Sequence, residues 1–380
     1  MRPTIQNHRQ LTPAPYFSHR VAAFLTFTMS FICGAARAYD ITDRLSVGGV
    51  LAGVYQIMDV EADGLEERGG GALSLQPEFS FRPTERDELS TKLGFAVGNS
   101  LNEVFPFVLN PWAAALEDEV KNINGSGRDY LLTAWYKHTF DLGRGGTLAL
   151  AAGLIDATDY LDVNAFANDE YTQFMNEALV NGPNGFFPSY DLGGALEWGS
   201  GSVEFRAVVM AVNSNEDGNA YQFYGIQFDY KVETPLGKGT YRLILDGTSD
   251  DFLDPAGEGT ESRSAASLSL DQELGDTIGV FVRIGTQDDD AAVNFKNLFS
   301  GGVSISGELW GRERDNVGIG YAFLNGGNLD IDFSQVAEAY ARLVLNDYLA
   351  LTLDIQYVRE KAGGGGEGFV CGLRLVLAEF

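Results

Sequence analysis

The chain has 380 residues but only two cysteines and three histidines, and its 26 basic residues face 53 acidic ones. This shortage of basic residues excludes nucleic-acid binding, because no basic patch is available to neutralise phosphates. Past the N-terminal segment, no apolar run approaches 18 residues, which excludes a transmembrane helix. No glycine motif for phosphate, cluster with metal-ligand spacing or catalytic triad stands out, so we expect neither a metal nor a cofactor.

The N-terminal segment has the features of a secretory signal. A basic region precedes an apolar run from Val21 to Ile32, and Ala36-Arg37-Ala38 provides an A-x-A cleavage site. A membrane anchor is the alternative, but this apolar run is shorter than the roughly 20 residues that a spanning helix needs. The sequence therefore predicts a signal peptide over residues 1–38 and a mature domain over residues 39–380.

Cleavage at that site would leave 22 basic and 53 acidic residues, a net charge of −31. Cys371 would be the only cysteine, so no intramolecular disulfide could form, and His138 would be the only histidine. So acidic a chain is compatible with a halophilic surface or with a cavity that attracts cations. Its plentiful aromatic and branched apolar residues argue against disorder.

Alternating polarity runs through the mature chain in segments of about ten residues. From Leu73 to Phe81 almost every second residue is apolar, and the residues between are mainly polar; the same pattern recurs from Leu349 to Tyr357. Such strands have one apolar and one polar face. They fit a membrane barrel with lipid outside and water inside, and they also fit a soluble β-sandwich whose apolar faces form a core.

Loop lengths favour the barrel. We count sixteen strands, the first beginning near Leu45, the twelfth near Gly301 and the last near Gly368. Seven short turns, including Arg312–Asn316, alternate strictly with eight longer loops. This asymmetry is typical of outer-membrane proteins, with short periplasmic turns and long external loops. The predicted fold is an all-β transmembrane antiparallel barrel of about 16 strands, closed by a strand that ends on Phe380.

The third long loop, Asp156–Ser189, is unusually long, polar and aromatic, as functional loops are. From about Asn168 to Val180 its apolar residues recur at helical spacing, which predicts a short helix that stops at Gly182. A surface loop packed on its own scaffold is the plain alternative. A barrel of this size leaves a wide aqueous channel, so we expect the loop to fold into the lumen and narrow it.

The run from Gly153 to Glu170, continued by Thr172–Asn176, resembles the characteristic segment of the OprB-type carbohydrate-selective porins. The resemblance extends more weakly over residues 45–380. It implies a sixteen-stranded outer-membrane porin of Gram-negative bacteria that admits sugars by passive diffusion, with carbohydrates, outer-membrane lipid and lipopolysaccharide as its partners. It leaves the preferred sugar open, and also the choice between monomer and trimer.

A sugar pore needs hydrogen-bonding groups that replace hydration, and aromatic faces that follow the apolar faces of sugar rings. The candidates for the solute path on the third loop are Asp156, Asp159, Tyr160, Asp162, Asn164, Phe166, Asn168 and Asp169. Strand alternation places a second group of charges on the lumen wall: Lys92, Arg206, Arg242, Arg283, Glu308, Arg342 and Asp354. Each of these charges could instead belong to an ion pair that only solvates the wall.

Three other functions remain open at this stage. A general or cation-favouring porin would use the acidity without selecting sugars. A barrel enzyme with a serine–histidine mechanism would have to use His138, but that residue lies near a strand end between aromatics, where an interfacial role is expected. A closed barrel that serves as an adhesin would conduct nothing. Acidic runs such as Asp288–Asp290 lie on predicted external loops, where they are solvated or bind divalent cations.

Overall fold

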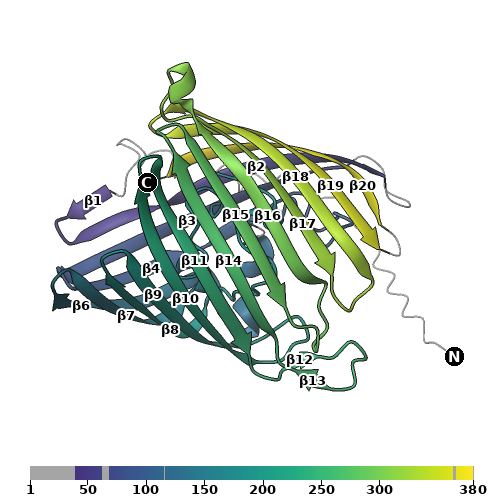
Figure 1. The fold of residues 1–380 in the computed structure, drawn as a ribbon, viewed down its shortest axis with the longest axis horizontal. Helices are drawn as coiled ribbons and strands as arrows, with labels where there is room; N and C mark the ends of the chain where they lie inside the picture. Colours follow the sequence, from purple (N-terminus) through teal and green to yellow (C-terminus); the bar gives the residue numbers. More distant parts are fainter. Residues whose placement is uncertain (1–38, 62–67, 115, 363–364, 380) are drawn as a thin grey trace. The chain divides into compact units, whose positions relative to one another are not determined.

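A computed structural model describes residues 39–61, 68–114, 116–362 and 365–379. The predicted signal peptide and Phe380 lie outside these residues. None of the helices that it describes is long and apolar enough to cross a membrane. The longest helices within the described residues have only four residues. The regular structure of the described chain is therefore almost entirely antiparallel strands (Figure 1).

The first half of the sheet contains β1 (Tyr39–Thr42), β2 (Leu45–Glu61), β3 (Arg68–Thr84), β4 (Asp87–Leu93), β5 (Phe95–Val97), β6 (Leu131–Gly143), β7 (Gly146–Ile155), β8 (Asp191–Ser200) and β9 (Val203–Val212). The second half contains β10 (Tyr221–Thr234), β11 (Gly237–Thr248), β14 (Ser264–Leu274), β15 (Ile278–Gln287), β16 (Phe295–Ser306), β17 (Asn316–Gly326), β18 (Ile331–Asn346), β19 (Leu349–Ala362) and β20 (Gly366–Glu379). A separate hairpin joins β12 (Phe252–Leu253) and β13 (Thr260–Glu261).

The sheet closes on itself. Each strand pairs with its neighbours in the chain, and β20 pairs back onto β2 from Val50↔Glu379 to Glu61↔Glu367. β4 and β5 form one strand interrupted at Gly94, since both pair with β3. The short β1 pairs only with the first residues of β2. With β4 and β5 counted as one strand and the short β1 left out, the eighteen strands of the sheet make a closed sixteen-stranded barrel. This confirms the predicted fold.

Side chains alternate across the barrel wall as the sequence predicts. In β10, for example, Tyr224, Phe228 and Tyr230 are exposed on the outer face, whereas Gln227 and Asp229 are buried on the inner face. An apolar outer face beside a polar inner face is the arrangement of a membrane barrel and not of a soluble sandwich.

One strand was misplaced by the sequence analysis. The twelfth barrel strand, β16, begins at Phe295 and not near Gly301, and it ends at Ser306. The connection to β17 is therefore longer than the predicted Arg312–Asn316, and it contains a 3-10 helix, η3 (Gly307–Trp310). Glycine and serine in the middle of β16 weaken the alternation on which the prediction relied.

Candidate functional site

The loop between β7 and β8, here called L3 (residues 156–190), has little regular structure. Asp156 caps the 3-10 helix η2 (Ala157–Asp159) by accepting a hydrogen bond from the Thr158 N–H at 2.9 Å. The helix predicted from Asn168 to Val180 is wrong in extent, because only α3 (Glu177–Val180) is helical. Contacts with the barrel wall, described next, replace the missing helical hydrogen bonds.

Arg283 on β15 is the central clamp of L3. The residue is 1 % exposed, and its Nε lies 2.8 Å from Oδ2 of Asp162. The other guanidinium nitrogens donate to the carbonyl oxygens of Leu179 and Val180, each at 3.2 Å, and of Ala167. One planar guanidinium thus holds three separate points of the loop, a task to which its five fixed donors are suited.

Two further charged residues of the wall hold the middle of L3. Glu338 on β18 accepts hydrogen bonds from the N–H groups of Met175 (2.5 Å) and Asn176 (3.0 Å), just before α3. Arg374 on β20 donates to the carbonyl oxygens of Glu170 (2.5 Å) and Gln173 (2.9 Å). Both wall residues are almost completely buried, so the loop satisfies charges that would otherwise be stranded inside the barrel.

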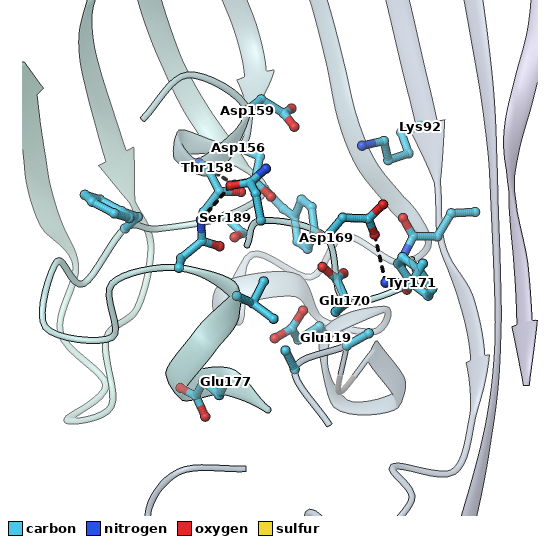
Figure 2. Close-up of a pocket in the computed structure, with 18 of the residues that line it drawn as sticks. Lys92, Glu119, Asp156, Thr158, Asp159, Asp169, Glu170, Tyr171, Glu177 and Ser189 are labelled. Carbon is cyan, nitrogen blue, oxygen red and sulfur yellow. Dashed lines mark hydrogen bonds between the residues drawn. The ribbon is translucent and has the colours of Figure 1, made fainter. Parts of the chain in front are cut away.

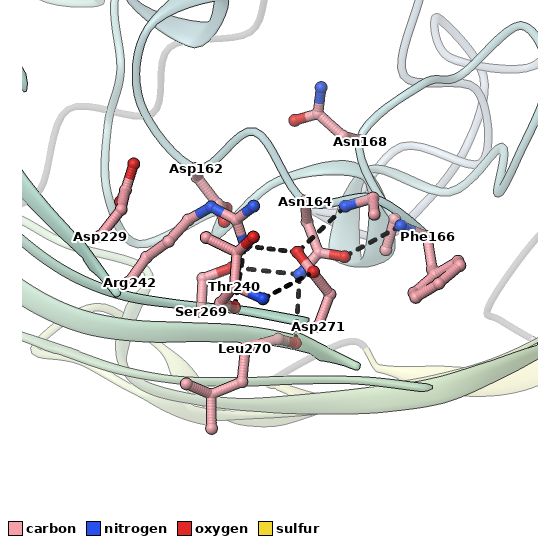
Figure 3. A network of polar contacts seen from close by, with 12 residues as sticks. Asp162, Asn164, Phe166, Asn168, Asp229, Thr240, Arg242, Ser269, Leu270 and Asp271 are labelled. Carbon is pink, nitrogen blue, oxygen red and sulfur yellow. Dashed lines mark hydrogen bonds and ion pairs between the residues drawn. The ribbon is translucent and has the colours of Figure 1, made fainter. Parts of the chain in front are cut away.

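A polar network holds the part of L3 around Asn164 (Figure 3). The Asn164 side chain donates to Oγ of Ser269 at 3.2 Å, and the Ala165 N–H donates to Asp271 at 3.2 Å. Asp271 also pairs with Arg242, whose Nη1 lies 2.5 Å from the carboxylate. With Gln227 on β10, which accepts from the Asp162 N–H at 2.8 Å, these contacts fix L3 inside the barrel, as predicted.

A second loop, whose inward fold was not predicted, also enters the barrel. L2 (residues 98–130) joins L3 through reciprocal hydrogen bonds of Asn110 and Glu177, both at 3.1 Å. Gln56 on β2 and Gln356 on β19 donate to the Pro111 carbonyl oxygen at 2.8 and 3.0 Å. The inward signal of L2 was its apolar content: Leu101, Phe107 and Leu109 are buried in one cluster with L3 and the wall.

L3 and the wall beside it border a cavity, and Figure 2 shows residues that line it. The packed wall, which comprises β10, β11, β14, β15 and β18–β20, carries the clamps described above. The open wall, which comprises β2, β3, β4, β6 and β8, faces two cavities instead, and the larger of them, of about 720 Å³, lies against β2, β3 and β4. Among the described residues, Lys92 is the single basic one that lines this larger cavity. Seven acidic residues line it: Glu78, Glu119, Asp156, Asp159, Asp169, Glu170 and Glu177.

A smaller cavity of about 230 Å³ adjoins the first. The two share Glu78, Lys92 and Asp159, so these three side chains mark where they meet. The smaller cavity is completed by Thr133, Trp135, Lys137, Tyr160 and Glu197. The two cavities are thus neighbours between L3 and the open wall, and both have a largely polar lining.

Two carboxyls of L3 are hard to ionise in this enclosed space. Enclosure by the barrel raises the pKa of Asp159 to about 6, against the opposing effect of Lys92, although the side chain is exposed to the cavity. For Glu170, enclosure and then the neighbouring charge of Asp169 raise the pKa to about 7. Both groups therefore change charge between pH 5 and pH 8.

The structure divides the predicted L3 residues into two sets. Asp156, Asp159, Asn168 and Asp169 line the larger cavity, and Tyr160 lines the smaller one. Asp162 and Asn164 are at most 2 % exposed and anchor the loop to the wall. The Phe166 ring packs beside Gly279 in a different depression, near the short turns.

The predicted lumen charges divide in the same way. Lys92 lines both cavities. Arg242 and Arg283 serve L3 and its wall, and Arg206 donates to the Tyr160 carbonyl oxygen at 3.1 Å. Arg342 and Asp354 lie on the inner faces of β18 and β19. Glu308 does not face the lumen from a strand, because it lies exposed in η3, a consequence of the shifted β16.

Several lining residues were missed, notably Glu78, Trp135, Lys137, Glu170 and Glu197. Four of them occupy inward positions on strands, so alternation could have revealed them. What it could not reveal is which inward positions L3 leaves uncovered.

His138 lies on the outer face of β6, since its neighbour Lys137 lines the cavity. Its Nδ1 is 2.7 Å from Oδ1 of Asp87, which also accepts a hydrogen bond from the Tyr136 hydroxyl at 2.5 Å. This cluster ties β4 to β6 near the short turns. Across the described ranges, no three His, Cys, Asp or Glu side chains are grouped so that they could hold a metal ion.

Comparison with known sequences gives two findings. The model of the carbohydrate-selective porin, OprB family, matches residues 113–377. An uncharacterized protein of Aquifex aeolicus is 29 % identical over 278 residues, which cover 71 % of this chain and 78 % of that protein.

Solved structures share the fold. The high-pH structure of Pseudomonas putida OprB aligns with a TM-score of 0.64 at 14 % identity, over 87 % of this chain and 94 % of that one. The outer membrane channel DcaP of Acinetobacter baumannii aligns with a TM-score of 0.56 at 8 % identity, over 90 % of this chain and 99 % of that one.

Proposed function

This chain belongs to the OprB family of carbohydrate-selective porins, and on that premise we propose that sugars cross the outer membrane between L3 and the open wall. Family and fold are those of an outer-membrane sugar channel and not of an enzyme. One observation supports the proposed route: the two cavities meet at Glu78, Lys92 and Asp159. A solute that passes from one to the other must pass these side chains.

The lining suits a neutral polyol. Carboxylates accept hydrogen bonds from sugar hydroxyls, and Lys92 donates to them, so the wall replaces part of the hydration shell that a sugar loses on entry. Many weak contacts spread along the path keep binding weak enough for release. Because Asp159 stands on L3 and Lys92 on β4, every solute passes between opposite charges.

The same lining favours cations over anions. Seven acidic residues against one lysine make the larger cavity strongly negative, and its low-dielectric walls concentrate that field. We therefore propose that the channel admits neutral and cationic solutes and rejects anionic carbohydrates such as sugar acids. Asp162, Asn164 and Phe166 then act by shaping the loop, while Asp156, Asp159, Tyr160, Asn168 and Asp169 meet the solute.

Liposome swelling with protein purified from outer membranes tests this function. Glucose should enter faster than neutral amino acids of similar size, and gluconate should enter several times more slowly than glucose. The double variant Asp159→Asn, Glu170→Gln should narrow the gap between glucose and gluconate without lowering glucose entry. Equal rates for glucose and the size-matched amino acids would contradict sugar selectivity and leave a general diffusion pore.

Export and membrane contacts complete the proposal. Residues 1–38 act as a cleaved signal, so mass spectrometry of the protein in the outer membrane should find Tyr39 at its N-terminus. The apolar outer face, with exposed residues such as Tyr55, Phe299 and Leu353, contacts lipid and lipopolysaccharide. Recovery of a chain that still carries residues 1–38 would contradict the cleavage.

A further inference from the structure

We infer that Arg263 is a two-position latch at the external mouth of the barrel, placed between Glu216 and Asp246. In the observed position its guanidinium pairs with Glu216 and holds L3 against an external loop. In the second position it pairs with Asp246 and releases L3. The inference concerns access to the larger cavity, and it does not depend on which solute crosses the channel.

The observed position joins two loops. Arg263 lies just before β14, and its guanidinium carbon is 4.9 Å from the centroid of the Phe186 ring and 5.1 Å from that of the Phe252 ring. Phe252 belongs to β12, in the external loop between β11 and β14 (Figure 1), whereas Phe186 belongs to L3 and lines the larger cavity. A guanidinium over the face of an aromatic ring is attracted to it as a cation–π partner. The arginine thus ties the end of L3 to this external loop.

The ion pair of the observed position is weak. Nη1 of Arg263 lies 3.2 Å from Oε1 of Glu216, whose side chain is 65 % exposed. An ion pair with so exposed a partner contributes little to stability and is screened by salt. Nη2 donates to Gln287 at 3.5 Å, and Nε has no hydrogen-bond partner among the described residues. The guanidinium therefore leaves part of its hydrogen-bonding capacity unused.

A buried carboxylate without a partner lies close by. Asp246 on β11 is 7 % exposed, and neither of its carboxylate oxygens has a hydrogen-bond partner within the part of the chain that the structure describes. Burying a charge without a partner is costly. The charge of Arg263 acts on this carboxylate. Pairing the two would satisfy both groups.

The register of the sheet puts Asp246 within reach. Asp246 pairs with Ala265 of β14, and Arg263 stands two residues before Ala265, so the two charged residues are diagonal neighbours on one face. Diagonal neighbours lie roughly 7–8 Å apart, a distance that long side chains span. The backbone of Arg263 is fixed, because its N–H donates to Oγ1 of Thr248 and its carbonyl oxygen accepts from the Thr248 N–H, both at 2.9 Å. Only the side chain has to move.

L3 is strained at the residue that the latch holds. Phe186 has φ +36°, a left-handed conformation that residues with bulky side chains rarely adopt. Such strain persists only where surrounding contacts hold it. When Arg263 turns to Asp246, Phe186 loses its cation–π contact, and the end of L3 relaxes. Because Phe186 lines the larger cavity, the channel then has two states of different conductance.

Single-channel recordings of protein purified from outer membranes test the latch. The wild type should switch between two conductance levels. Raising KCl from about 0.1 M to about 1 M should favour the second level, because salt screens the exposed Glu216 pair more than the buried Asp246 pair. Glu216→Gln should increase the fraction of time in the second level several-fold. Asp246→Asn has nearly the same shape but no charge for Arg263 to pair with, so it should abolish the second level.

Glu258→Gln is the matched control, since it removes an exposed carboxylate from another external position and should leave the time in each level unchanged. A first level equal in conductance to that of the wild type shows that each variant is folded. Opposite effects of Glu216→Gln and Asp246→Asn are the signature of a latch, because a merely structural role would not shift them in opposite directions. A single level in the wild type at both salt concentrations, or a second level that persists in Asp246→Asn, would refute the latch. Neither result bears on the proposed function, which the swelling rates of sugars test separately.

Discussion

The two walls of the barrel differ sharply in what covers them. The packed wall is hidden behind L3 and L2, which bring Phe174 and Leu179 against wall residues such as Phe281 and Tyr340. The open wall faces water and lines both cavities. The same alternating strands thus border an apolar core on one side and a solute path on the other. A wide barrel is narrowed here by filling one side of its lumen.

The difference also explains the distribution of charge. Charged residues on the packed wall, such as Arg283 and Glu338, are buried and use their hydrogen-bonding capacity on the loop backbone. Those on the open wall, such as Lys92 and Glu197, remain partly exposed to the cavity. A lumen charge can therefore act on the solute only where no loop covers it.

Breaking the clamp at Arg283 should have the largest effect. Arg283→Met leaves Asp162 buried without its partner and removes the donors to three loop carbonyls, and losing one member of a buried pair costs about 3–5 kcal/mol. L3 should leave the packed wall, so we expect higher single-channel conductance and entry of larger oligosaccharides. The control is Arg359→Ala, an exposed pair with Glu367 that is worth about 0–1 kcal/mol. Identical conductance in Arg283→Met and wild type would show that the clamp does not hold the loop.

The second-largest effect should come from a backbone change at Gly153 on β7. Gly153 has φ +146°, and a Cβ there would lie 2.2 Å from the Ala134 carbonyl oxygen, so Gly153→Ala must push β6 away from β7. We expect a loss of about 2–4 kcal/mol in the free energy of unfolding, measured by urea titration in micelles. Gly143→Ala has positive φ but open space around it, and should cost only about 1 kcal/mol. Equal losses in both variants would mean that the close approach at Gly153 is unimportant.

The smallest effect should come from pH. Asp159 and Glu170 have pKa values raised to about 6 and about 7, so both are ionised at pH 8 and largely neutral at pH 5. The groups around them are Glu78, Lys92, Lys137, Asp156 and Asp169. The lining thus becomes less negative as pH falls, and cation preference, measured as a reversal potential in a KCl gradient, should decrease with a midpoint between pH 6 and pH 7.

The double variant Asp159→Asn, Glu170→Gln provides the comparison for this titration, and its reversal potential should barely change over the same range. If the reversal potential of the double variant changes with pH as much as that of the wild type, groups other than Asp159 and Glu170 cause the pH dependence.

A raised carboxyl pKa also means that the folded state binds the proton more tightly than the unfolded chain does. The contribution of these two groups to stability is therefore most favourable in acid and is lost as pH rises through 6 and 7.

The sequence was sufficient for features that depend on neighbouring residues. Strand alternation and loop length predicted sixteen strands and the inward fold of L3, because period-two patterns and loop composition are local properties. Prediction failed where the deciding partner is distant. The expected helix from Asn168 to Val180 is mostly absent because Glu338 and Arg374 bind its backbone. The residues of this segment give no sign of these distant partners.

The site shows the same division. Asp156 and Asp159, predicted for the solute path, line the larger cavity, whereas Asp162 has the same chemistry but pairs with Arg283, 121 residues further along the chain. Which acidic residue meets the solute and which one anchors the loop depends on that distant partner. Glu308 was misplaced for a simpler reason, since glycines blurred the boundary of β16.

The anchoring of L3 also has a consequence for the order of assembly. Its partners on β15, β18 and β20 follow it by 121, 163 and 204 residues in the chain. Contacts of such long range close large loops and form slowly. During synthesis and export L3 emerges before its partners exist, so it cannot dock until the last strands are in place. The full set of anchors of L3 can therefore form only once β20 is in place, so narrowing of the channel is complete only at the end of folding.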